Sequence, residues 1–80
     1  MKPAVGQRWN WKYGDTNFVA EVTEVAKSKD SGKLTVRIQI VSVTTGGYKV
    51  GESMQSYGLR VIANGGRESA WTYLEGQDRE

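Results

Sequence analysis

The 80-residue chain contains no cysteine, no histidine and only one proline. Without cysteine there is no disulfide framework, and without cysteine or histidine there is no zinc site of the usual kind. The same absences remove the thiol nucleophile and the imidazole general base on which many enzymes depend. We therefore expect a protein that is not an enzyme, with no catalytic residue, no cofactor and no metal.

Long apolar runs are also absent. The N-terminal segment has no apolar stretch of signal-peptide length, and no run of 18 apolar residues occurs anywhere. These features predict a cytoplasmic protein that does not associate with a membrane. The length predicts a single small domain over residues 1–75, and the polar composition of residues 76–80 predicts a C-terminal tail.

The main pattern that is present is the alternation of apolar and polar residues, which is typical of β-strands. In residues 33–40 the even positions are apolar and the odd positions are polar. One face of this strand is expected to be buried, through Leu34, Val36, Ile38 and Ile40. At Val41 the phase inverts, which indicates a bulge or a sharp bend in a long strand.

Other segments alternate in the same way. The first covers residues 5–13 and places five residues on one face, namely Val5, Gln7, Trp9, Trp11 and Tyr13. The second, residues 17–27, slips phase at Val25. In residues 53–62, Tyr57, Leu59 and Val61 alternate and predict a strand, and the aromatic residues near the C-terminus predict a short final strand.

Five or six short strands cannot leave a flat sheet with two long open edges, so closure into a small barrel is expected. We predict an all-β fold, a small SH3-like barrel of five to six antiparallel strands, with an OB-fold as the alternative. The pattern resembles SH3-like and Tudor-like small barrels in its strand count, its long bent run at 33–44 and its aromatic strand near the C-terminus. A second resemblance, to small uncharacterised phage or prophage proteins, rests on the segments VGQRWNW and WTYLEGQ and implies no activity.

The aromatic residues are the first candidates for a functional surface, because flat rings provide contact area at little entropic cost. They predict a small non-enzymatic interaction module that binds a protein surface or peptide, as a monomer or weak homodimer. The alternative is that these rings fill the core. The candidate protein-binding residues are Trp9, Trp11, Tyr48, Tyr57, Trp71 and Tyr73. The chemistry of Trp71, Tyr73 and Glu75 also matches a cage for a cationic side chain.

A basic hairpin gives the alternative function, a small nucleic-acid-binding barrel. Clustered basic residues attract phosphates, and counterion release drives their binding. The candidate residues are Arg8, Lys12, Lys27, Lys29, Lys33 and Arg37. The net charge of +2 is small for such a domain, and lysines on a hairpin also serve to prevent aggregation.

Overall fold

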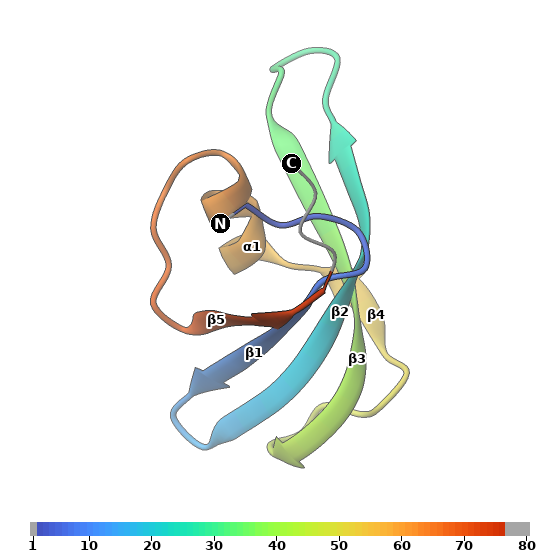
Figure 1. Cartoon of the computed structure of the whole chain (residues 1–80), viewed down its shortest axis with the longest axis vertical. Coiled ribbons are helices and arrows are strands. Elements are labelled where there is room, and N and C mark those ends of the chain that lie inside the picture. Colours follow the sequence, from blue (N-terminus) through green and yellow to red (C-terminus); the bar gives the residue numbers. More distant parts are fainter. Residues whose placement is uncertain (1, 77–80) are drawn as a thin grey trace.

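A computed structural model describes residues 2–76; Met1 and residues 77–80, which include most of the expected polar tail, lie outside the described residues. The strands are β1 (Arg8–Tyr13), β2 (Thr16–Lys27), β3 (Leu34–Thr45), β4 (Ser53–Gln55) and β5 (Trp71–Glu75). They form one antiparallel sheet in the order β4-β3-β2-β1-β5, with a short helix, α1 (Tyr57–Ala63), between β4 and β5 (Figure 1). The prediction of an all-β protein is therefore confirmed in its general form. Between residues 2 and 76, no helix has the length and apolar character needed to cross a bilayer.

The tight turn between β1 and β2 sets the register of the first hairpin. Only Gly14 and Asp15 lie between the paired residues Tyr13 and Thr16, and Gly14 has φ +58°. Glycine reaches this region without steric cost, which is why it opens two-residue hairpin turns of this kind. A shift by one residue would turn every side chain of β1 to the other face of the sheet.

Two irregularities explain the phase changes in the sequence. In the β2–β3 ladder, Val19 faces Ser42 and Ala20 faces Ile40, so Val41 is an extra residue on β3. The bulge predicted at Val41 is confirmed. A second extra residue, Thr23 on β2, brings Val25 onto the same face as the apolar residues before it. Such bulges increase local twist and bend the strand, and the long β2 and β3 curve strongly in Figure 1.

One face of the sheet and α1 enclose the core. The predicted burial of β3 is confirmed for its three central apolar residues and is partial for Leu34. By contrast, Val5, which the alternation placed on the same face as Trp9, precedes β1 and is exposed, because the chain turns before the strand begins. The buried apolar residues are Trp9, Phe18, Ala20, Val22, Val36, Ile38, Ile40, Leu59, Ala63 and Trp71.

The prediction of a strand continuing through residues 57–62 is wrong, since α1 occupies this segment. The hydroxyl of Ser56 accepts a hydrogen bond from the backbone N–H of Leu59 (3.1 Å), which caps the first turn. Leu59 and Ala63, four residues apart, place both buried side chains on one helical face. Alternation and helical spacing overlap in such a short segment, and the cap is the signal that separates them.

Asn64, the C-cap residue at the other end of α1, connects the helix to the start of β3. Its side-chain amide donates to the carbonyl of Leu34 and its side-chain oxygen accepts from the N–H of Leu34, both at 2.9 Å. The same amide donates to the carbonyl of Arg60 at 2.8 Å. Asn64 thus acts as a strand partner for one residue of β3 and holds α1 against the sheet.

Candidate functional site

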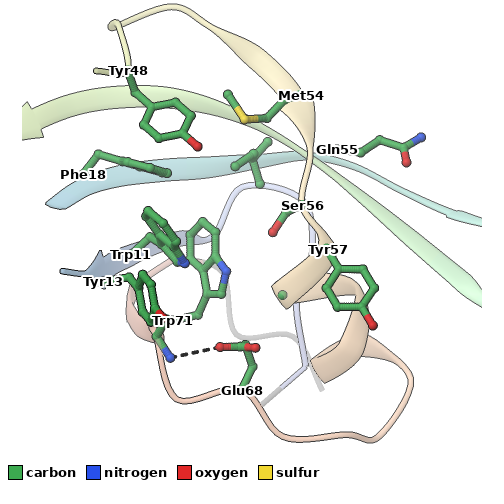
Figure 2. Close-up of a pocket in the computed structure, with 13 residues that line it drawn as sticks. Trp11, Tyr13, Phe18, Tyr48, Met54, Gln55, Ser56, Tyr57, Glu68 and Trp71 are labelled. Carbon is green, nitrogen blue, oxygen red and sulfur yellow. Dashed lines mark hydrogen bonds between the residues drawn. The ribbon is translucent and has the colours of Figure 1, made fainter. Parts of the chain in front are cut away.

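An aromatic pocket lies where the two outer strands of the sheet, β4 and β5, come near the start of α1. Its volume is about 400 Å³, which is within the range of ligand pockets in proteins. The walls come from β1, β2, β3, the β3–β4 connection, β4, the first turn of α1, and β5 with the segment that enters it (Figure 2). Its aromatic residues are Trp11, Tyr13, Phe18, Tyr48, Tyr57 and Trp71.

Trp11 is the central ring of this pocket. It lies opposite Phe18 of β2 and opposite Trp71 of β5 in the strand registers, with ring centroids 5.3 Å and 6.2 Å away. Tyr13 and Tyr48 lie 6.0 Å and 6.3 Å from Trp11. These tilted and edge-on arrangements are the ones that aromatic pairs prefer, and they fix the pocket wall.

Gly58, in the first turn of α1, allows the helix to approach this wall closely. A Cβ atom at this position would lie 2.4 Å from Nε1 of Trp71 and 3.1 Å from Cγ of Glu68. Both distances are too short for an ordinary contact, so a residue with a side chain would displace its neighbours. Gly58 therefore brings the edge of Trp71, the Glu68 side chain and the start of α1 together.

The rim of the pocket is formed by exposed tyrosines. The exposed fractions of Tyr13, Tyr48 and Tyr57 are 71%, 37% and 73%. In contrast, Phe18 and Trp71 lie at the base and are almost completely buried. Large exposed rings beside a hollow are typical of interaction sites, because a partner removes their faces from water at little entropic cost.

Glu68 supplies the charge of the pocket. One carboxylate oxygen accepts a hydrogen bond from the backbone N–H of Ala70 at 3.2 Å, and the end of the side chain lies next to Trp71 (Figure 2). Among the described residues that line the pocket, Glu68 is the only charged one. Within residues 2–76, the ion pair found is Arg8–Glu21, at 3.4 Å, and no basic residue pairs with Glu68.

The structure brings together four of the six predicted protein-binding residues, namely Trp11, Tyr48, Tyr57 and Trp71. The alternative interpretation, burial in the core, holds for Trp9, which is 4% exposed and donates its indole N–H to Oε1 of Gln7 (3.0 Å). Tyr73 packs edge-on against Trp9, at a centroid distance of 5.7 Å, and does not line the pocket. Glu75 also does not line the pocket and lies opposite Arg8 in the strand register, so this pocket contains only Trp71 of the three residues suggested as a cage.

Tyr13, Phe18 and Glu68 are pocket residues outside the six candidates. The alternation placed Tyr13 on the same face as Trp9 and Trp11, and at the last position of β1 it is exposed because the core no longer covers it. Phe18 reaches the pocket through its pairing with Trp11 across the hairpin. Glu68 lies in an irregular segment, and no local pattern in the sequence marks it.

The six basic candidates do not form one cluster. The residues Lys27, Lys29 and Lys33 belong to the exposed tip of the β2–β3 hairpin. Lys12 pairs with Asn17, ten residues before Lys27 along β2, and at about 3.3 Å per residue this separates the two lysines by about 30 Å.

Acidic residues lie beside or opposite the two remaining basic candidates, Arg8 and Arg37. Arg8 forms its ion pair with Glu21, and Arg37 lies opposite Glu24 in the strand register. Opposite charges facing each other across strands stabilise a sheet and reduce the positive field above it. Nucleic-acid binding through the six basic residues stays a prediction.

The described residues, 2–76, contain no group of three or more acidic side chains that could hold a metal ion. Comparison of the chain with known proteins gave no match to a family model, to a curated protein or to a solved structure. The argument for function therefore depends on the geometry of the pocket.

Proposed function

We propose that this protein is a small interaction module that binds a peptide segment of another protein in the aromatic pocket. The observation that carries this proposal is the gathering of six of the eight aromatic residues around one hollow, with three tyrosines exposed at its rim. Aromatic-lined grooves on small β-domains bind extended peptides, because rings provide broad contact area and need little ordering. The base of the pocket is already packed into the core, so binding need not reorganise it.

An SH3-like barrel is the finer description of the fold that we propose. It is supported by the five antiparallel strands, by the bulges that bend β2 and β3, and by the return of β5 to pair with β1. Bent strands can take part in both halves of a small closed sheet. An experimental structure tests this proposal through the hydrogen bonding of the two outer strands, β4 and β5.

Selection from a random peptide library tests the proposed binding function. The selected peptides would be titrated into the wild-type protein and into the rim variants Tyr13→Ser and Tyr57→Ser. Two matched controls, Val5→Ser and Leu74→Ser, remove exposed apolar side chains that do not line the pocket. We expect about tenfold weaker binding for at least one rim variant, since hot-spot tyrosines contribute on this scale, and little change for the controls.

Binding must also map to the pocket. Changes in the amide resonances of α1, the β1–β2 hairpin and the β3–β4 connection would support the proposal. Selected peptides that bind the four variants equally, or a library that yields no binder at millimolar protein concentration, would contradict it.

A further inference from the structure

The pocket combines aromatic faces with a carboxylate that has no basic partner among residues 2–76, and this combination selects for a positive charge. The face of an aromatic ring carries partial negative charge, so a cation above it is attracted electrostatically. Glu68 adds a full negative charge beside Trp71. None of the described residues that line the pocket is Lys or Arg, although the chain contains 11 such residues. The pocket is therefore complementary to a cationic group that the described residues, 2–76, do not supply.

We infer that the pocket binds the side chain of an arginine in the partner peptide, with its guanidinium paired to Glu68 and packed against the aromatic wall. This inference rests on the proposed function and names the residue that anchors the peptide. The guanidinium group is planar and more weakly hydrated than an ammonium group, so it leaves water for an aromatic site at lower cost. Its fork of N–H donors matches a carboxylate.

The geometry of Glu68 suits this role. One oxygen is held by the N–H of Ala70, which orients the carboxylate before any ligand arrives. Because the hydrogen bond from Ala70 already fixes the Glu68 side chain, little conformational entropy is lost when a guanidinium pairs with it. The side chain is half-buried next to Trp71, where the aromatic wall reduces screening by water.

The rings at the rim also give an arginine side chain a path to Glu68. Tyr13 and Tyr57 are exposed rings at the rim, and Trp11 lies between the rim and the base. An arginine stem can lie along these rings while its charged end reaches Glu68, because long cationic side chains bury their methylene groups and keep the polar end paired. The rest of the peptide then lies over the rim tyrosines.

A pair of capped five-residue peptides tests the inference. One carries a single central arginine in a glycine–serine frame, and the other carries citrulline, a neutral residue of nearly the same shape. Both are titrated into the protein at about 150 mM salt, where exposed charges more than about 8 Å apart are largely screened. The amide and indole resonances of Trp11 and Trp71 report where each peptide binds. We expect the citrulline peptide to bind at least about tenfold more weakly.

Two charge-neutralising variants distinguish binding to Glu68 in the pocket from a general electrostatic attraction to the protein. Glu68→Gln keeps an oxygen that can accept from Ala70 and should remove the preference for arginine over citrulline. The matched control, Glu24→Gln, removes the same charge from the outer face of the sheet, and it should keep the preference within about twofold.

The remaining outcomes overturn the inference. The inference is contradicted if the two peptides bind with equal affinity, or if Glu24→Gln and Glu68→Gln weaken peptide binding equally. It is also contradicted if the resonance shifts lie outside the pocket, or if the arginine peptide does not bind at millimolar concentration. The library selection then distinguishes the two proposals. Library peptides with apolar anchors that bind the pocket would leave the proposed function intact, whereas the absence of any pocket-binding peptide would remove both.

Discussion

The buried hydrogen bond between Gln7 and Trp9 is the contact whose loss can be predicted with the best-defined magnitude. Gln7 is 2% exposed, and its Oε1 accepts from the indole N–H of Trp9 and from the backbone N–H of Ala4, both at 3.0 Å. Gln7→Met retains most of the side-chain volume and removes the acceptor. A large cavity is therefore not created, and the two donors that lose their partner contribute directly to the cost.

The two donors differ in what they lose. The indole N–H of Trp9 belongs to a side chain with almost no contact with water, so leaving it unpaired costs about 1–3 kcal/mol. Ala4 is only half-buried near the N-terminal end of the described chain, and water can replace its lost partner. We therefore expect Gln7→Met to lower the free energy of unfolding by about 2 kcal/mol, and the melting temperature by about 8–16 °C for a domain of this size.

The measurement is urea and thermal unfolding followed by circular dichroism, combined with a double-mutant cycle. The cycle compares Gln7→Met, Trp9→Phe and the double variant, because phenylalanine has no N–H to leave unpaired. We expect a coupling of about 1 kcal/mol or more. The control Gln39→Met changes an exposed glutamine and should alter stability by no more than about 0.5 kcal/mol. A Gln7→Met variant as stable as the wild type, or a cycle without coupling, would refute the reasoning.

Three further predictions follow from the core, the pocket and the cap. Ile38→Ala should cost about 2–5 kcal/mol in urea unfolding, because Ile38 is 1% exposed at the centre of β3. Gly58→Ala should displace Trp71 and remove the pocket, and the displacement should change the tryptophan fluorescence emission. Unchanged emission spectra together with unchanged peptide binding would contradict this prediction. Asn64→Ala should cost about 1–2 kcal/mol and speed amide exchange at Leu34, and undiminished protection there would show that the cap is unimportant.

Part of the fold follows from local patterns. The alternation in β3 predicted its buried face, and the phase inversion at Val41 predicted its bulge. These predictions succeed because strand pleating forces alternate side chains to opposite faces, so a slip in the pattern requires an extra residue. The helix at residues 57–63 was missed because seven residues fit either period, and the decisive signal was the single cap at Ser56.

The residues of the candidate site were likewise predicted only in part from the sequence. Trp11 and Trp71 were predicted as contact residues from their type alone, and the structure places both in the pocket. Trp9 has the same type and lies two residues from Trp11, but the core covers it. Tyr73 was separated from the pocket in the same way, through its contact with Trp9. Residue type does not distinguish these rings, since burial depends on which other elements cover each end of the strand.

The sequence by itself determined the strand-forming character of the chain, its tight turns and its lack of cysteine and histidine chemistry. These properties depend on residue type and on neighbours only a few positions away, which the sequence states directly. Only the tertiary structure decided that Tyr13, Glu68 and Trp71 meet at one pocket, because the pairing of β1 with β5 and the packing of α1 join segments separated by about 55 residues. Such contacts depend on the register of every strand between them and on the close approach at Gly58, and neither is encoded in any single segment.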